Sequence, residues 1–345
     1  MGLFTGSSCA AIVAALGMVL VGGCAKEAAP VAPKLTLLDP RMTPPAAKPP
    51  VNVAVAAMLP PGNIAPPPAP GASAPAADLR VMSFNCRVST LFDLHNTWGL
   101  RKGLLVDTIR NFRPDLLGTQ ELLAGQADYL REQLDGYSFV GVGRDDGKRG
   151  GEMCGVFFRA DKFDKLDSGS FWLSESPSVP GSKGWGAFFP RLVTWVKLQP
   201  RDGGTTFCWF NTHLDAFSSR ARLNGAKLLK LRMASIAHGM PVLVTGDFNA
   251  DAGSDPYKEL TRASVLTDTF RAANTGVVKG DGTRHAFRGG RGGPRIDWIL
   301  ASSGDFRTID ADINHTRSGI MFPSDHFPVT AVLRPTGVAP LARIE

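Results

Sequence analysis

Short apolar runs that end in a polar residue dominate the hydrophobic pattern of this chain from residue 78 onward. The clearest is the Val-rich run at 241–245, which is bounded by Pro and Gly and leads into Asp247-Phe248-Asn249. Such a run predicts a fully buried strand. Because strand side chains alternate, Asp247 and Asn249 are expected to face the same way, with Phe248 directed into the core. An Asx turn that caps the strand is the alternative interpretation.

The same kind of pattern predicts further strands and helices along the chain. Strands are expected over 79–85, 115–121, 138–142, 152–159, 165–173, 192–198, 205–211, 296–301 and 327–333. Apolar stripes at helical spacing predict helices over 101–112, 124–134 and 220–237, and short helical pieces near 255–262. Gly239 is expected to cap the helix that ends at 237. Strands mixed with helices in this way predict an α/β fold with two facing mixed sheets and helices outside.

Six of the predicted strands have polar residues at one end, which is the main functional signal in the sequence. These polar ends are Asn85, Gln120-Glu121, the segment 211–213, Asp247 with Asn249, Asp297, and Asp325-His326. A single cluster of this kind is usually a cap or a structural histidine. Recurrence at six strand ends is not explained by capping alone, and it favours one site that handles a water, a metal or a phosphate.

The first 77 residues differ in composition from the rest of the chain. Residues 1–24 resemble an export signal, with an apolar core that is too short to span a bilayer and a lipobox-like end at Cys24. Residues 25–77 are rich in Pro and Ala and predict a disordered tether. We therefore expect a folded domain over 78–345 in an exported, monomeric lipoprotein, which contacts the membrane only through its lipid anchor. Secretion is the alternative if the lipobox is not used.

The net charge and the cysteines add only weak constraints on the class of substrate and on metal or disulfide content. The net charge of +7 permits a polyanionic substrate but does not demand one. The folded part contains Cys86, Cys154 and Cys208 in apolar, strand-like runs, and their spacing does not suit a zinc site. We expect buried free thiols, with one disulfide as the alternative in an oxidising compartment.

The ordered set of polar strand ends resembles the endonuclease/exonuclease/phosphatase superfamily, the metal-dependent phosphoesterases that include DNase I. Its most specific parts are the Gly-Asp-Phe-Asn motif at 246–249 and the Ser-Asp-His-Phe-Pro-Val motif at 324–329. The resemblance covers about residues 79–333. It implies a DNase I-like, four-layer α/β/β/α sandwich.

The resemblance also implies a metal site. Glu121 would be the main ligand of a Mg²⁺ ion, with Mn²⁺ as the alternative ion. Asn85 and Asp325 would lie beside it, as ligands directly or through water. A hard cation that prefers carboxylate oxygens and keeps several waters suits this set.

Further roles follow from the same resemblance. Asp247 and His326 would activate or orient the attacking water, and Asp297 would fix the tautomer of His326. Asn249 would donate to the phosphate or to the nucleophile, and His213 would contact the scissile phosphate or assist the leaving group.

Two supporting residues complete the implied site. Glu152 matches the position that pairs with His213 in DNase-like members. Arg191 would bind phosphate, with a surface ion pair as the alternative.

Together these features predict a Mg²⁺-dependent phosphoesterase that hydrolyses a phosphodiester or phosphomonoester by direct in-line attack of water, because no Ser or Cys lies beside an obvious base. A nuclease, with nucleic acid as partner, is the first candidate. The alternatives are a sphingomyelinase-like enzyme, a small-molecule phosphatase, and a non-catalytic surface-tethered binding protein of the same fold. The sequence identifies no aromatic residues placed to stack on bases.

Overall fold

The protein is described by a computed structural model that covers residues 77–276 and 281–337. The predicted signal segment and nearly all of the predicted tether lie outside these described residues. Within them, no helix has both the length and the apolar character needed to cross a bilayer.

Two six-stranded sheets form the centre of the fold, with strand orders β11-β12-β1-β2-β4-β3 and β5-β6-β7-β8-β10-β9. The first sheet contains β1 (Leu79–Asn85), β2 (Leu116–Gln120), β3 (Tyr137–Val140), β4 (Val156–Arg159), β11 (Phe306–Ile313) and β12 (Val329–Pro335). The second contains β5 (Phe163–Trp172), β6 (Leu192–Pro200), β7 (Phe207–His213), β8 (Val242–Asp247), β9 (Leu266–Asp268) and β10 (Asp297–Ser302). In each sheet one central pair, β1/β2 or β7/β8, is parallel and the other pairs are antiparallel. The predicted pair of mixed sheets is therefore confirmed.

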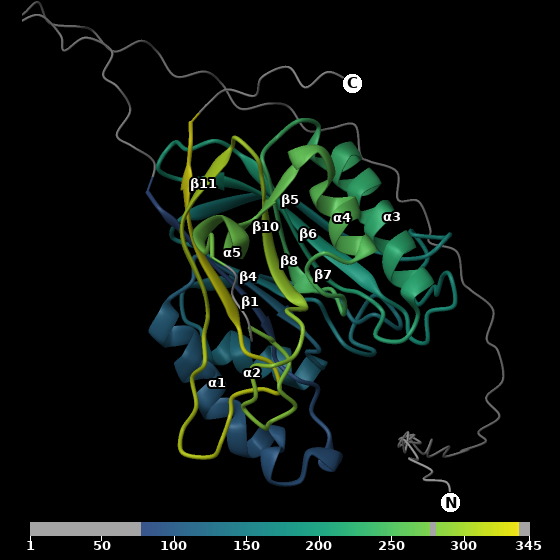
Figure 1. Cartoon of the computed structure of the whole chain (residues 1–345), viewed down its shortest axis with the longest axis vertical. Helices are drawn as coiled ribbons and strands as arrows, with labels where there is room; N and C mark the ends of the chain where they lie inside the picture. Colours follow the sequence, from purple (N-terminus) through teal and green to yellow (C-terminus); the bar gives the residue numbers. More distant parts are fainter. Residues whose placement is uncertain (1–76, 277–280, 338–345) are drawn as a thin grey trace, which may run out of the picture. The chain divides into compact units, whose positions relative to one another are not determined.

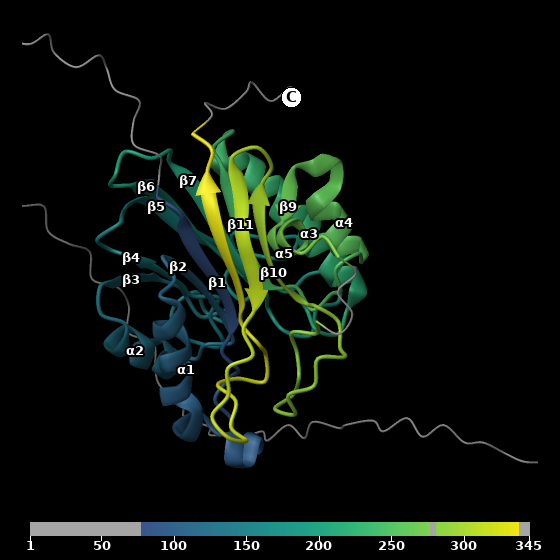
Figure 2. The same ribbon diagram turned by 60° about the vertical axis from the view of Figure 1, so that its left-hand side comes forward.

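Helices cover the outer faces of both sheets (Figures 1 and 2). Helices α1 (Trp98–Phe112) and α2 (Ala124–Gln133) pack on the first sheet. Helices α3 (Ser219–Ala237) and α4 (Asp255–Thr261) pack on the second. The remaining helical pieces are short: α5 (Thr269–Ala273) and the 3₁₀ turns η1 (Leu91–Asn96) and η2 (Arg262–Ser264). The resulting order of layers is the predicted α/β/β/α sandwich.

The core has three layers because both faces of each sheet are covered. In β1, Leu79 and Val81 point between the sheets, whereas Met82 and Phe84 pack under the helices of the first sheet. Strands buried on both faces are expected to be apolar along their whole length rather than alternating. That is why the central strands are evident in the sequence.

The sequence-based assignment differs from the structure in four places. Strands β9 and β11 are absent from it, because β9 has only three residues and β11, at a sheet edge, buries only Ala311 and Ile313. The strand predicted over 152–159 is reduced to β4, since Met153 forms only isolated bridges. Helix α3 ends at Ala237 and is capped by His238, whose backbone takes the left-handed conformation (φ 46°) one residue before the predicted cap, Gly239.

A polar network joins the two sheets behind the polar strand ends. Asn211 on β7 donates from Nδ2 to the carbonyls of Thr119 (2.8 Å) and Gly155 (3.0 Å), and its Oδ1 accepts from Gln120 (2.8 Å). All of these groups are buried. Asn211 is thus a link between sheets rather than part of an open site. The thiols of Cys86, Cys154 and Cys208 are buried and free, as predicted.

Candidate active site at the strand ends

Strands from both sheets bring the predicted site residues to one edge of the sandwich. Asn85 and Gln120 end the parallel strands β1 and β2 in register, and His213 and Asp247 end the parallel strands β7 and β8 in register. Strand β10 runs antiparallel to β8, so its first residue, Asp297, pairs with Asp247. Strand β12 runs antiparallel to β1, and therefore the residues just before it lie at the same edge.

Asn85 connects the two sheets at this edge. Its Nδ2 donates to Oε1 of Glu121 (2.9 Å) and to Oδ2 of Asp247 (2.9 Å). The other Glu121 oxygen accepts from the backbone N–H of Val88 (2.9 Å), and Asn85 Oδ1 accepts from that of Arg87 (2.9 Å). Glu121 takes a left-handed backbone conformation (φ 61°) directly after β2, which ends the strand at this point.

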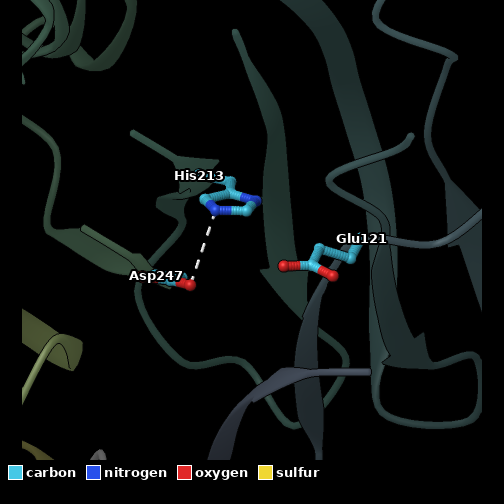
Figure 3. A group of neighbouring side chains, drawn as sticks. All are labelled: Glu121, His213 and Asp247. Atoms are coloured by element: carbon cyan, nitrogen blue, oxygen red, sulfur yellow. Dashed lines mark ion pairs between the residues drawn. The ribbon is translucent and has the colours of Figure 1, made fainter. Parts of the chain in front are cut away.

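The Glu121 carboxylate is held in its ionised form. Burial opposes ionisation, but the hydrogen bond from Asn85 and the positive charge of His326 together lower the pKa of Glu121. Figure 3 shows Glu121, His213 and Asp247 facing a common space, in which Nε2 of His213 lies 3.5 Å from Oδ2 of Asp247.

His326 forms a buried pair with Asp297. Nδ1 of His326 lies 2.9 Å from Oδ2 of Asp297 and 3.9 Å from Oδ2 of Asp247. Burial disfavours the charged imidazole, but the Asp297 carboxylate outweighs it and raises the pKa of His326 to about 10. Burial and the neighbouring Asp297 raise the pKa of Asp247 to about 7. The site therefore holds an imidazolium next to a carboxylate that titrates near neutral pH.

His213 is a neutral imidazole. Burial, with Arg191 and Arg144 adding repulsion, lowers its pKa well below the usual value. Asn249 Nδ2 lies 2.9 Å from Nε2 of His213 and also donates to the carbonyl of Leu214 (3.1 Å). Because the amide nitrogen is a donor, Nε2 of His213 must accept, and the ring proton lies on Nδ1.

Asn249 fits both interpretations of the motif, as part of an Asx turn that caps the strand and as a side chain of the site. Its N–H donates to Oδ1 of Asp247 (2.9 Å), which makes the Asx turn, and its φ of 46° places the side chain against His213. Phe248 is fully buried and stacks on Trp298 at 4.2 Å, as the alternation predicts.

The residues at this edge fit a hard divalent cation. Ligand atoms of Glu121, His213 and Asp247 lie within 4.8 Å of one another, as do those of Asp247, Asp297 and His326. Asp325 is buried, and its Oδ1 has no hydrogen-bond partner within residues 77–276 and 281–337. Burial and the Glu121 carboxylate raise the pKa of Asp325, although His326 opposes them. Carboxylate oxygens that lack enough donors are what Mg²⁺ or Mn²⁺ would satisfy, with Glu121, Asn85 and Asp325 holding it.

Six of the predicted catalytic and metal-site residues line a cleft with a volume of about 740 Å³: Glu121, His213, Asp247, Asn249, Asp325 and His326. Four arginines also line it: Arg87, Arg144, Arg191 and Arg284. The sequence analysis included only Arg191 among them. The others follow strand ends or lie in loops, so no periodic pattern marks them. Together they give the cleft a wall of guanidinium groups, three of which pair with a carboxylate: Asp93, Glu152 or Asp215.

The two supporting residues have partners that the sequence did not indicate. Glu152 pairs with Arg144, at 2.7 Å between Oε2 and Nη1, rather than with His213. Burial, and then the charge of Glu121, raise the pKa of Glu152. Arg191 is buried, and its Nε lies 3.9 Å from Oδ2 of Asp215, so it is not a surface ion pair.

Arg101 is a buried support that sequence analysis missed. Its guanidinium donates to the carbonyls of Cys86 (2.7 Å), Arg87 (2.7 Å), Asn96 (3.0 Å) and Pro323 (2.9 Å). It thereby ties the segment after β1 to the segment that carries Asp325 and His326. Its place at the start of the predicted helix 101–112 gave no signal, because these contacts join residues that are far apart in sequence.

Two facing mixed sheets with this polar cluster at one edge define a DNase I-like α/β protein. The chain matches the model of the Endonuclease/Exonuclease/phosphatase family over residues 82–326 and belongs to that family. The family consists of phosphoesterase hydrolases that depend on divalent metals, which agrees with the acidic and histidine clusters of this site.

Solved structures similar to this chain include two from Bacteroides. A mannosyl-6-phosphatase of Bacteroides thetaiotaomicron is 34% identical, with a TM-score of 0.68, and the match covers 74% of this chain and 99% of that one. An endonuclease/exonuclease/phosphatase from Bacteroides vulgatus is 35% identical, with a TM-score of 0.71, and the match covers 75% and 100%.

Human nocturnin is a more distant relative. It is 24% identical over 231 residues, which cover 62% of this chain and 48% of nocturnin, so the chain spans about half the length of that protein. The structure of the human nocturnin catalytic domain with bound sulfate superposes with a TM-score of 0.61 at 23% identity, a likeness of fold.

Proposed function

We propose that this protein is a divalent-metal-dependent phosphoesterase that hydrolyses a phosphate ester by direct attack of water. The observation that carries the proposal is the single amide of Asn85, which bonds to Glu121 from one sheet and to Asp247 from the other. A metal-binding carboxylate and a titrating carboxylate are thereby fixed in one cleft. A bound Mg²⁺ or Mn²⁺ ion neutralises phosphate charge and stabilises the leaving oxygen.

Asp247 is the general base in this proposal. Its pKa of about 7 suits proton transfer from water near neutral pH. Asn249 is a positioning residue in this proposal, because its backbone N–H holds Asp247 and its side-chain amide holds His213.

His326 supplies positive charge where the phosphate binds. As an imidazolium it donates one N–H to Asp297 and carries a second N–H for a phosphate or leaving-group oxygen. Asp297 acts through His326 by fixing its orientation and charge. Neutral His213 lies beside the same Asp247 oxygen as His326, and its proton can be donated to the phosphate or to the leaving group.

A phosphomonoester on a small cyclic alcohol is the substrate class that the cleft supports best. A volume of about 740 Å³ lies within the usual range for small-molecule sites, roughly 300–1,000 Å³. A relative that is 34% identical over nearly its whole length is a mannosyl-6-phosphatase. The arginine wall would also suit the backbone of a nucleic acid, so a nuclease is the second candidate.

A substrate panel tests the proposal. The full chain is incubated with Mg²⁺, with and without EDTA, against hexose 6-phosphates, nucleoside monophosphates, plasmid DNA, RNA and sphingomyelin. Phosphate release from the monoesters, abolished by EDTA, is expected. Cleavage of DNA or RNA alone would indicate a nuclease instead. Cleavage of sphingomyelin alone would indicate a sphingomyelinase-like enzyme. No metal-dependent turnover at all would favour a non-catalytic binding protein.

We also propose that the chain is exported and lipidated at Cys24, on the sequence of residues 1–24 alone. Cell fractionation tests this point. The wild-type protein is expected with membranes, and Cys24→Ser is expected in the soluble fraction. A wild-type protein that is soluble after export would indicate secretion instead.

A further inference from the structure

Three exposed phenylalanines gather at the rim of the catalytic cleft. Phe188, Phe189 and Phe217 are 60%, 39% and 71% exposed. The ring centroids of Phe188 and Phe189 are 4.9 Å apart, and those of Phe188 and Phe217 are 5.6 Å apart, both in edge-to-face geometry. Phe189 and Phe217 line the same cleft as Glu121 and His326. We name these three residues the aromatic rim.

A buried carboxylate holds the aromatic rim in place. Asp215 is 2% exposed. Its Oδ2 accepts from the backbone N–H of Phe188 (3.2 Å), and its Oδ1 accepts from those of Phe217 (2.9 Å) and Ser218 (2.7 Å). The hydroxyl of Ser218 donates to the carbonyl of Trp185 (3.2 Å), which joins the same two loops a second time. Aromatic side chains on a fixed backbone lose little further entropy when a ligand contacts them.

Charged groups connect the aromatic rim to the phosphate site. The guanidinium of Arg144 lies 4.6 Å from the ring centroid of Phe189 and pairs with Glu152 at 2.7 Å. Arg191 directly follows the loop that carries Phe188 and Phe189, and it lines the cleft beside His213. The cleft therefore changes from carboxylates and histidines, through arginines, to apolar rings at its edge.

We propose that the aromatic rim is a subsite that stacks on the ring of the substrate's leaving group, while the phosphate lies at Glu121 and His326. This inference rests on the proposed phosphoesterase function and adds the selection of a cyclic leaving group over an acyclic one. Aromatic faces bind the apolar face of a pyranose and the flat face of a nucleobase. The shared chemistry is a phosphomonoester whose alcohol carries a ring with a flat or apolar face.

The test is a ratio of specificity constants in the full chain. The value of kcat/KM is measured for glucose 6-phosphate and adenosine 5′-monophosphate, and each is divided by the value for glycerol 3-phosphate, which has no ring. Phe217→Ala is expected to lower the ratio for the preferred ring about tenfold, chiefly through KM. Phe92→Ala is the matched control, because Phe92 is 89% exposed and does not line the cleft. It should leave both ratios unchanged.

A binding measurement separates this inference from the proposed function. Titration calorimetry with His326→Ala, in which turnover is expected to be slowed roughly 10²–10⁴-fold, gives the dissociation constants of the same three phosphates. Adding Phe217→Ala should weaken binding of the ring-bearing phosphate about tenfold relative to glycerol 3-phosphate. If Phe217→Ala weakens binding of glucose 6-phosphate more, the ring is a sugar. If it weakens binding of adenosine 5′-monophosphate more, the ring belongs to a nucleoside.

The outcomes of the two measurements are distinguishable. Equal ratios in the wild type, Phe217→Ala and Phe188→Ala, together with unchanged relative affinities, would overturn the aromatic subsite while the phosphoesterase function stands. Absence of any wild-type turnover would contradict the proposed function, and ring-selective binding would still support the subsite. Phe217→Leu, which keeps apolar bulk but removes the ring, should behave like Phe217→Ala if stacking is the cause.

Discussion

The two histidines of the cleft have different charges because their neighbours differ. His326 lies against the carboxylates of Asp297 and Asp247, which raise its pKa despite burial. His213 lies near Arg191 and Arg144, and burial and these cations lower its pKa. One site therefore contains a fixed cation and a neutral imidazole, a separation of roles set by environment.

Replacing His326 tests the role of the cation. His326→Ala removes the imidazolium that we propose faces the phosphate, and kcat is expected to fall by roughly 10²–10⁴-fold. Steady-state kinetics on the preferred substrate measure the loss, and circular dichroism checks that the variant is folded. An enzyme that remains fully active without this side chain would remove His326 from the mechanism.

The His326–Asp297 pair also makes stability depend on pH. The folded protein keeps the His326 proton up to a pH of about 10, whereas the unfolded chain loses it near 6.5. Its contribution to the free energy of unfolding is therefore complete below pH 6.5 and falls as the pH rises toward 10. Between pH 6.5 and 9, the metal-free protein should lose roughly 3 kcal/mol relative to His326→Gln. Denaturant unfolding in EDTA at both pH values measures this difference, and parallel pH dependences in the two proteins would rule it out.

At the scale of elements, the close approach of the two sheets positions the site. A Cβ added to Gly118 on β2 would lie 2.3 Å from Oγ1 of Thr245 and 2.7 Å from Oδ1 of Asn211, both on strands of the facing sheet. The buried hydrogen bonds among these side chains leave no room for a methyl group. Glycine at this position thus sets the spacing that lets Asn85 reach both Glu121 and Asp247.

Two glycine substitutions with opposite expected signs test this packing. Gly118→Ala should lower the free energy of unfolding by about 1–3 kcal/mol, because it overpacks the interface between the sheets. Gly103→Ala, on the exposed face of α1 with no atom within 4 Å of the added Cβ, should raise it by about 0.5–1 kcal/mol through helix propensity. Urea unfolding measures both changes. A neutral Gly118→Ala would show that the sheets can separate at this point without cost.

The sequence was most informative about elements that are buried on both faces. The strands that carry Asn85, His213 and Asp247 are continuous apolar runs that end in polar residues, and each was predicted within two residues of its observed end. Edge strand β11 was missed because only two of its eight residues, Ala311 and Ile313, are buried. The chemistry at the strand ends was visible in the sequence since the motifs are local.

Contacts between distant segments account for most of what the sequence could not show. Arg101 and the carbonyl of Pro323 are 222 residues apart in sequence. Phe188 and Phe217 belong to separate loops, which Asp215 joins by accepting from the backbone N–H of both residues. No periodicity or motif indicates either contact. The ion pair between Glu152 and Arg144 likewise forms only in the tertiary structure, and no motif in the sequence indicates it.

At the scale of the whole domain, the cleft lies between the two sheets and needs residues from both. Glu121 comes from the first sheet, whereas His213 and Asp247 come from the second, and Figure 3 shows the three side chains facing one another. An ion held here would bring together carboxylates that otherwise repel, so metal binding is expected to stabilise the fold as well as to permit turnover.

The most direct test of the central claim is a Mg²⁺ titration of phosphate release by the wild type and by Glu121→Gln. The wild type is predicted to need Mg²⁺ and to lose all activity in EDTA. Glu121→Gln is predicted to need at least about tenfold more Mg²⁺ for half-maximal rate. Glu132→Gln, an exposed position on α2, serves as the matched control and should titrate like the wild type. Hydrolysis that persists in EDTA, or an unchanged Mg²⁺ requirement in Glu121→Gln, would contradict the account.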